Sequence, residues 1–386
     1  MKDQLTVQLL ASAEELLALA PECDAQARRM QPRLPFATSS WLLLWWQHYC
    51  ESRLLVRDRF YVHTVRDAQG TLVAIAPLML TERPGSGPFR ARTLGFFGGD
   101  KNVTELRGLV CAPEAEGAAV RAVLAHFSER EQEWDWFNWY GVRAGSEAYA
   151  ALSQAKNFHW IRETRDYVLP LPATWDEFRQ GRSRNIKESL RKCYNSLKRA
   201  GHAFEFRVVD ASADLPAALR RFFELHAARA AAPGQVAHSD VFSRPRAREF
   251  LLDLAQRPTE ALSMRVFQLS IAGSVVASRV GFVQGDELYL YFSGYEQSWS
   301  AYSVMTTTLA ESIKWAIQNR FRLLNLSPGT DVSKTRWGAT AIETGNGVLV
   351  GSSRRSRAVF ATLQELNERS RSGALAHLVG RARRLG

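Results

Sequence analysis

The sequence has 386 residues, of which 46% are hydrophobic and 23% charged, so it has the composition of a globular protein long enough for two cores. The net charge of +11 favours anionic ligands. Apolar runs at residues 42–46 and 72–80 are too short to cross a bilayer. The N-terminal segment carries acidic residues and no basic region, which predicts a cytoplasmic protein without a signal peptide.

The four cysteines, Cys23, Cys50, Cys111 and Cys193, are scattered along the chain. They form neither a CxxC pair nor a spacing typical of metal ligands, so we expect reduced structural thiols and no metal. The sequence also has no Ser-His-Asp order and no Walker loop, which weighs against a hydrolase or an NTPase.

The first half alternates predicted helices and strands. Residues 40–49 favour a helix that carries Trp41, Trp45 and Trp46 largely along one face, a pattern typical of core residues. The turn Asp67–Gly70 predicts a hairpin. The other predicted elements are a helix at 14–19, strands at 60–65 and 72–78, a loop at 81–92, a strand at 106–110, a helix at 113–128 and a strand at 134–140.

The second half repeats this order of elements. Strands are predicted at 263–270, 275–283 and 288–292, where apolar and polar residues alternate or the run is apolar. A polar loop at 294–303 leads into a helix on which Met305, Leu309, Ile313 and Ile317 recur every four residues. Residues 321–326 favour a closing strand.

The repeated order of strands and helix predicts an α/β (α+β) fold of two tandem lobes, each a mixed, mostly antiparallel sheet flanked by helices. We place the lobes at residues 1–165 and 166–350, with a basic helical tail at 351–386. Chance similarity between two α/β halves is the alternative explanation.

A basic segment lies between the halves. Thr174–Glu177 matches a capping box, which predicts a helix start. Residues 179–199 then carry many more basic than acidic residues, most of them arginines, beside a narrow apolar seam. This segment is either a solvated helix face or a surface that binds a phosphate or carboxylate of a substrate.

Motifs in both halves resemble one known family. In the first half these are FATSSWLLLWWQHY, GTLVAIAPLML and LGFFGG; in the second they are RSRNIKESLRKCYNSLKRAG, GSVVASRVGF, YLYFSGYEQSWSAYSVMTTTL and NLSPGTDVSKTRWG. From about residue 36 to 338 the chain is similar to GNAT-superfamily acetyltransferases of cellulose and exopolysaccharide biosynthesis (the CelD/BcsL-like family), distant relatives of the Fem aminoacyltransferases.

This resemblance implies that a strand, loop, helix and strand hold the pyrophosphate of acetyl-CoA or another acyl-CoA at a helix N-terminus. The implied cofactor-binding residues are Ser293, Gly294, Ser303, Val304, Met305 and Thr306. The sequence departs from the family at Ser303-Val304, where a small pair such as Pro-Gly is usual. A β-carbon at Val304 is expected to narrow the approach of the pyrophosphate.

Acyl transfer needs a base for the acceptor and an acid for the departing thiolate. The candidate bases are Asp331, Glu311 and Glu287, and the candidate acids are Tyr295 and Tyr302. Cationic and imidazole side chains are expected to bind the acceptor or cofactor phosphate: Arg182, Arg184, Lys187, Arg191, His238, Lys334 and Arg336.

Three functions remain open. The first is an acyl-CoA-dependent N- or O-acyltransferase acting on a cell-envelope or exopolysaccharide precursor, with a small-molecule or saccharide acceptor. The second is a Fem-like transferase that takes an aminoacyl group from tRNA, and the third is a non-catalytic binding or scaffold protein. The basic tail is expected either to dock as a helix or to contact a membrane surface or an envelope-synthesis complex.

Overall fold

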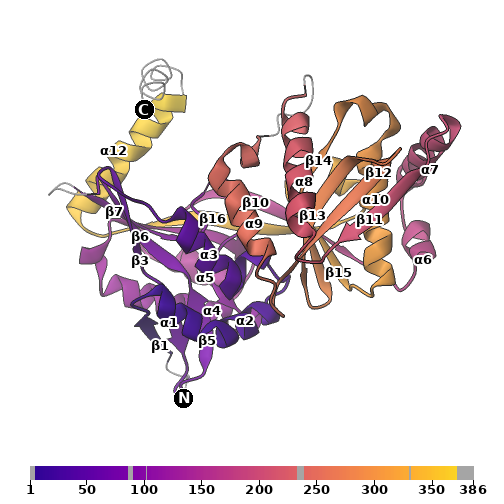
Figure 1. Ribbon diagram of the computed structural model, residues 1–386. Helices are drawn as coiled ribbons and strands as arrows, with labels where there is room; N and C mark the ends of the chain where they lie inside the picture. The colour runs from indigo at the N-terminus through magenta and orange to yellow at the C-terminus, as the bar shows by residue number, and fades with distance from the viewer. Residues whose placement is uncertain (1–4, 86–89, 101, 233–238, 330–331, 372–386) are drawn as a thin grey trace.

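The computed structural model describes residues 5–85, 90–100, 102–232, 239–329 and 332–371 (Figure 1). The first half contains helices α1 (Ala13–Ala18), α2 (Ala20–Arg29), α3 (Ser39–Tyr49), α4 (Pro113–Ser128) and α5 (Glu147–Gln154). Its strands are β1 (Thr6–Leu9), β2 (Ser52–Arg53), β3 (Val56–Phe60), β4 (His63–Arg66), β5 (Leu72–Ala76), β6 (Leu78–Arg83), β7 (Ala91–Phe96), β8 (Val110–Cys111), β9 (Trp136–Arg143) and β10 (Phe158–Pro170).

The second half contains helices α6 (Trp175–Gln180), α7 (Arg184–Arg199), α8 (Leu215–Ala230), α9 (Pro245–Ala255), α10 (Val304–Gln318), α11 (Val332–Thr335) and α12 (Arg354–Arg371). Its strands are β11 (Phe204–Val209), β12 (Ser263–Ile271), β13 (Ser274–Gln284), β14 (Glu287–Tyr295), β15 (Leu323–Pro328) and β16 (Thr340–Val350). The mixed α/β fold predicted from the sequence is confirmed.

Several elements form where local sequence patterns predict them. Thr174 and Glu177 make the reciprocal hydrogen bonds of a capping box at the start of α6. On α7, the residues Ile186, Leu190, Cys193 and Leu197 are buried at the spacing of an apolar seam, while most of the basic residues stay exposed. Apolar spacing therefore decides which face of the basic segment packs inward.

One twelve-stranded sheet runs through both halves, in the order β11-β12-β13-β14-β15-β10-β16-β9-β7-β6-β3-β2. In the second half, β12, β13 and β14 are antiparallel, α10 follows, and β15 returns parallel to β14. In the first half, β3, β6 and β7 are antiparallel, α4 follows, and β9 returns parallel to β7. The sheet is thus continuous and contains an internal repeat.

The last strand of each repeat is exchanged between the halves. Strand β10 follows β9 in sequence but pairs with β15, and β16 follows β15 but pairs with β9. The two exchanged strands pair with each other at the centre of the sheet. We match β12, β13, β14, β15 and β16 of the second half with β3, β6, β7, β9 and β10 of the first half. With this matching, the strand order is the same when it is read from either end of the sheet. The predicted boundary between residues 165 and 166 stays a prediction, and β10 runs through it.

The first-half repeat uses different strands from those expected. The predicted hairpin at 60–65 and 72–78 forms, as β4 and β5, but it belongs to a separate four-stranded sheet of order β1-β4-β5-β8. The loop predicted at 81–92 was wrong in part, because β6 extends to Arg83 and pairs with β7, which begins at Ala91. Of the strand predicted at 106–110, only Val110 is in a strand, β8.

Aromatic side chains join the two halves. Trp41 of α3 is 1% exposed and packs edge-on against Phe250 and Phe282 of the second half. Phe36 contacts Tyr289 with ring centres 5.2 Å apart. Such pairs contribute beyond their apolar area. The predicted tryptophan stripe is therefore core, and this core is shared between the halves, which lie side by side in Figure 1.

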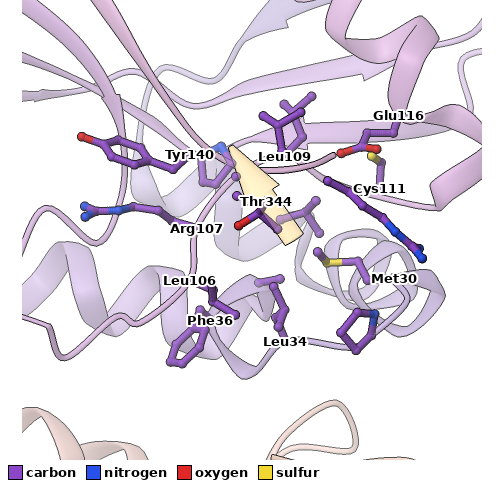
Figure 2. Close-up of a pocket in the computed structure, with 18 of the residues that line it drawn as sticks. Met30, Leu34, Phe36, Leu106, Arg107, Leu109, Cys111, Glu116, Tyr140 and Thr344 are labelled. Atoms are coloured by element: carbon purple, nitrogen blue, oxygen red, sulfur yellow. The ribbon is translucent and has the colours of Figure 1, made fainter. Parts of the chain in front are cut away.

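Each parallel strand pair also borders a cavity. The first-half cavity, about 130 Å³, lies beside the end of β7, the end of β9 and the start of α4 (Figure 2). The second-half cavity, about 420 Å³, lies beside the corresponding elements β14, β15 and α10. The internal repeat therefore extends from the strands to the hollows beside them.

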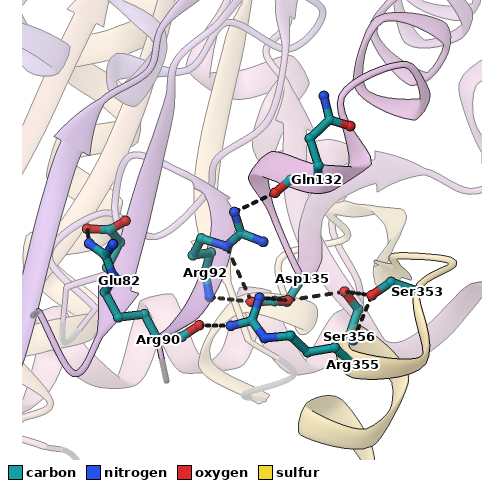
Figure 3. A network of polar contacts seen from close by, with 8 residues as sticks. All are labelled: Glu82, Arg90, Arg92, Gln132, Asp135, Ser353, Arg355 and Ser356. Atoms are coloured by element: carbon teal, nitrogen blue, oxygen red, sulfur yellow. Dashed lines mark hydrogen bonds and ion pairs between the residues drawn. The ribbon is translucent and has the colours of Figure 1, made fainter. Parts of the chain in front are cut away.

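Helix α12 is anchored through the buried carboxylate of Asp135, which precedes β9 (Figure 3). Asp135 is fully buried, and it accepts hydrogen bonds from the Arg92 amide at 2.7 Å and the Ser356 hydroxyl at 3.1 Å. The Arg355 guanidinium lies 3.3 Å from the same carboxylate. The first turn of the tail helix therefore docks on the first half. Among the described helices, none combines the length and apolar character needed to cross a membrane.

Gly294 lies where α8 passes close to β14. A β-carbon there would lie 2.3 Å from the amide nitrogen of His226 and 2.4 Å from the carbonyl carbon of Leu225, both backbone atoms. We expect Gly294→Ala to lower the free energy of unfolding by about 1–3 kcal/mol, because α8 must move away. Chemical denaturation measures this change. Gly95→Ala on β7, where the added β-carbon meets nothing within 4 Å, is the matched control and should be close to wild type.

Candidate active site

The second-half cavity forms where a parallel strand pair separates. Strands β14 and β15 pair only from Glu287–Leu323 to Tyr289–Asn325. Beyond the last pair, Tyr289–Asn325 (the last rung of this ladder), β14 continues alongside β13, while β15 continues alongside β10. The 3-10 helix η4 (Gln297–Tyr302) then leads from β14 into α10. The strands therefore open a fork whose outer side is closed by the start of a helix.

The cavity is lined from both halves of the chain. Its second-half residues include Ser293 and Tyr295 from β14 and Ser327 and Pro328 from β15. The start of α10 contributes Ser303, Val304, Met305 and Thr306, and the first-half loop between β7 and β8 contributes Asn102 and Glu105. A volume of about 420 Å³ is within the range of small-molecule sites.

Four cationic side chains line this cavity. Arg229 donates to the Ser293 hydroxyl at 2.8 Å, and Arg336 donates to the Thr306 hydroxyl at 2.9 Å. Lys334 donates to the Ser327 hydroxyl at 2.9 Å. Burial lowers the pKa of the fourth, Arg279, to about 10, with the nearby Arg229 charge adding to the effect. The cavity is therefore strongly electropositive and suited to an anion.

Among the described residues that line this cavity, Glu105 is the carboxylate, and it comes from the first half. Its Oε2 accepts a hydrogen bond of 2.8 Å from the Tyr289 hydroxyl. Burial raises the pKa of Glu105 to about 7, although Lys334 acts in the opposite direction. A carboxylate that titrates near neutral pH in a cavity is suited to accept a proton from a reacting group.

The residue that caps α10 has an unusual backbone. Ser303 has φ of 54° and ψ of 38°, in the left-handed region, and its side chain makes no capping hydrogen bond. The first amides of a helix lack intrahelical partners, so this end can bind an anion. Val304 lines the cavity, although its side chain is 1% exposed and packs in the core with Leu197 and Tyr295. Its expected effect on the approach of a pyrophosphate stays a prediction.

All but one of the predicted cofactor-binding residues line the second-half cavity. Ser293, Ser303, Val304, Met305 and Thr306 all line the cavity. Gly294 is not among the lining residues, and its lack of a side chain admits α8 instead. Their role in binding an acyl donor remains a prediction.

The predicted catalytic residues are divided. Tyr295 lines the cavity, whereas Tyr302 lies outside it and packs against His202 and Trp299. Glu311 lies on the α7 side of α10, where Lys314 donates to it at 2.7 Å. Glu287 is bound by the Arg33 amide at 2.9 Å and by Arg322. Asp331 lies outside the described residues.

The predicted substrate residues are also divided. Lys334 and Arg336 line the cavity, and His238 lies outside the described residues. Arg182 instead packs on the Phe178 ring, and the exposed Arg184 pairs with Glu188 at 2.9 Å. The remaining two, Lys187 and Arg191, line a separate groove of about 670 Å³ between α6, α7 and α10.

Sequence reasoning missed the cavity residues that lie outside the segment from β14 to Arg336. Arg279 had a signal, because a cation inside an otherwise apolar predicted strand is unusual. Arg229 on α8 follows the buried His226 by one turn. Glu105 had no local signal, since its position in the cavity depends on how the two halves pack.

The ionisation of Glu105 predicts a pH-dependent stability. Its pKa in the folded state, about 7, is above its ordinary value of 4.5, so its contribution to stability is full at low pH and is lost as the pH rises through about 7. We therefore expect Glu105→Gln to gain stability relative to wild type between about pH 5 and about pH 8, by more than about 1 kcal/mol. Denaturation curves at both pH values test this. Glu249→Gln, on the exposed side of α9, should show no such change.

Comparison with known proteins agrees with this geometry. Residues 184–335 match the family model described as "Acetyltransferase (GNAT) domain". The fold is similar to that of a crystal structure of FemX, with a TM-score of 0.57 and 12% identity, covering 89% of this chain and 97% of that one.

A second solved structure shares the fold. It is the C-terminal domain of a putative lysylphosphatidylglycerol synthetase from Agrobacterium fabrum, with a TM-score of 0.52 and 12% identity, covering 91% of this chain and 96% of that one. A comparison with curated protein sequences finds no match. Residues 184–335 are therefore similar to a GNAT acetyltransferase domain, and the chain shares its fold with FemX.

Proposed function

We propose that this protein is an acyl-CoA-dependent acyltransferase, with acetyl-CoA as the expected donor. The observation that carries the proposal is the fork between β14 and β15, which opens beside the start of α10 in a cavity lined by four cations. As the resemblance to the CelD/BcsL-like family implies, the acceptor is an amine or hydroxyl of a cell-envelope or exopolysaccharide precursor.

The residues of the cavity fit the pyrophosphate of a coenzyme A thioester. The Nε atoms of Arg279 and Arg336 are buried, and neither has a hydrogen-bond partner among the described residues. Ser303 leaves the start of α10 without a side-chain cap. Guanidinium groups and helix-start amides are the groups that bind phosphate oxygens in proteins. Both kinds of donor line this cavity.

Glu105 and Tyr295 are the proposed groups for proton transfer, because both line the cavity. For an amine acceptor that binds as an ammonium ion, Glu105 takes one proton and frees the nitrogen lone pair. The nitrogen then bonds to the acyl carbon as the carbon–sulfur bond breaks, and the second proton goes to the departing thiolate, with Tyr295 as the candidate relay. A backbone amide near Ser293–Tyr295 is the candidate for polarising the acyl oxygen.

Ser303 offers a matched pair of substitutions. Asn and Asp both tolerate the left-handed region and both cap helices well, so Ser303→Asn and Ser303→Asp should fold like wild type. The carboxylate of Ser303→Asp faces an anion site, so we expect it to weaken acetyl-CoA binding by more than about tenfold in calorimetry. Ser303→Asn should bind nearly as wild type does. Normal binding by Ser303→Asp would place the donor elsewhere.

Glu105→Gln tests the proposed base. The amide keeps an acceptor for the Tyr289 hydroxyl but takes up no proton, so we expect kcat to fall by about 10²–10⁴ while the Kd for acetyl-CoA stays unchanged. In wild type, kcat/KM should rise with pH through about 7. An unaltered kcat in the variant would remove Glu105 from the chemistry. Acetyl-CoA binding without any turnover in wild type, across candidate acceptors, would favour a binding protein.

A Fem-like transfer from aminoacyl-tRNA is the second candidate. The observation in its favour is the groove between α6, α7 and α10, where Lys187, Arg191 and Lys314 surround Trp175 and Tyr194. Cations beside aromatic rings suit a nucleic acid. Titration with tRNA at increasing salt distinguishes the two functions, because this candidate requires binding that persists at about 150 mM salt.

A further inference from the structure

The first-half cavity occupies the position that the internal repeat makes equivalent to the donor cavity. The parallel pair β7–β9 ends after Thr93–Trp136 and Leu94–Phe137, as β14–β15 ends at Tyr289–Asn325. Phe97, after β7, and Trp139 to Arg143, at the end of β9, line the cavity, as does Pro113 at the start of α4. The two cavities are therefore the same structural feature in two copies.

The first-half copy is not suited to a phosphate. Proline at the start of α4 removes one of the amides that would face an anion, and Glu114 and Glu116 lie in its first turn. Negative charge at a helix N-terminus opposes a bound anion. Of the cationic lining residues, Arg107 lies over the Tyr140 ring at 4.2 Å, and Arg143 is exposed and interacts with Glu116. The electrostatics of the two copies therefore differ in sign at the helix start.

Most of the first-half cavity wall is apolar (Figure 2). Met30, Leu34 and Phe36 approach from the segment between α2 and α3, and Leu106 and Leu109 approach from the loop before β8. The volume is about 130 Å³. An apolar cavity of about 150 Å³ is large enough to bind benzene. The wall therefore accepts an apolar group of about the size of one aromatic ring.

One carboxylate of this cavity, Asp166, has an oxygen to which no side chain donates a hydrogen bond. Asp166 is 3% exposed, and its Oδ2 accepts a hydrogen bond of 2.7 Å from Asn325. Its Oδ1 is buried and has no hydrogen-bond partner of ordinary geometry in the part of the chain that the structure describes, although the Tyr167 amide lies near enough to the carboxylate to lower its pKa against the effect of burial. Buried carboxylate oxygens are costly when they lack a donor. A ligand that carries an amine would supply this donor.

Asp166 also lies next to the proposed catalytic group. Asn325, which holds Asp166, is the strand partner of Tyr289, which holds Glu105. Both carboxylates are thus fixed to the last rung before the fork. Glu105 lines the donor cavity, and its neighbour Leu106 lines the first-half cavity. A group bound at Asp166 is therefore close to the donor site.

We propose that the first-half cavity binds the acceptor, and that the reacting part of the acceptor is a primary amine joined to an apolar group of about the size of a benzene ring. The apolar group fills the space among Phe36, Leu106 and Leu109, and the amine donates to Asp166 Oδ1 beside Glu105. This inference rests on the proposed function, whose acceptor class it narrows to amines.

The test uses the full chain with benzylamine, benzyl alcohol and 2-aminoethanol as probes. At saturating acetyl-CoA, release of the coenzyme A thiol should show a KM for benzylamine at least about tenfold below that for 2-aminoethanol, because the ring is buried. Benzyl alcohol should not be acetylated at a comparable rate. Equal or better use of 2-aminoethanol or benzyl alcohol would overturn the proposal.

Two variants test the cavity and its carboxylate. Leu109→Trp fills the space and should raise the KM for benzylamine more than about tenfold while leaving the Kd for acetyl-CoA unchanged. Leu54→Trp, at a position 75% exposed, controls for the added indole and should match wild type. Asp166→Asn should weaken benzylamine binding in calorimetry about tenfold or more. An unchanged KM in a folded Leu109→Trp, or unchanged binding in Asp166→Asn, would overturn the proposal.

The outcomes separate this inference from the proposed function. If wild type binds acetyl-CoA but not benzylamine, the donor site stands and the acceptor proposal fails. If wild type does not bind acetyl-CoA, the proposed function fails. Benzylamine binding that is lost in Asp166→Asn would then still assign the first-half cavity to an amine. If Leu109→Trp does not fold, the proposal is tested by benzylamine binding to Asp166→Asn and by the comparison of the three probes on wild type.

Discussion

The short pairing between β14 and β15 is the constraint on which the site depends. Parallel strands that stop pairing leave backbone groups that need other partners. Here β13 and β10 hold the outer edges of β14 and β15 beyond the fork, and the Ser293 carbonyl of β14 accepts hydrogen bonds from the side chains of His226 and Arg229. The last rung, Tyr289–Asn325, also holds Glu105 and Asp166 through side-chain hydrogen bonds. Strand geometry and the positions of the two carboxylates are therefore set by one feature.

The two copies of the fork show how one backbone geometry supports different binding. In the second half, a serine precedes α10 and the wall is cationic; in the first half, α4 begins with proline and glutamates and the wall is apolar. The loop between β7 and β8 contributes to both walls. The first half thus completes the second-half cavity as well as forming its own.

Local patterns predicted the elements whose partners are close in sequence. Helices α3, α4 and α10 and the strands β12, β13 and β14 formed where their periodicity placed them, because each buries one face or one stripe. The first-half repeat was assigned to the wrong strands, since β6 and β7 flank a segment rich in proline and glycine that favours a loop.

The site was predicted only in part for a related reason. Ser303, Thr306, Lys334 and Arg336 were found because they lie in one continuous motif. The left-handed backbone of Ser303 was not predicted, because a serine does not signal that conformation. Glu105 was missed because more than a hundred residues separate it in sequence from the second-half residues of the cavity. The local periodicity of apolar residues does not indicate which distant segments pack together.

The exchange of β10 and β16 has a consequence for how the chain is made. During synthesis, β9 emerges with one edge that only β16 covers, and roughly 200 residues lie between them. At ribosomal rates of about 5–20 residues per second, that edge stays open for roughly 10–40 s. Neither half is therefore an independent folding unit. We expect the nascent first half to bind chaperones until β16 is synthesised, because the unpaired edge of β9 is prone to aggregation.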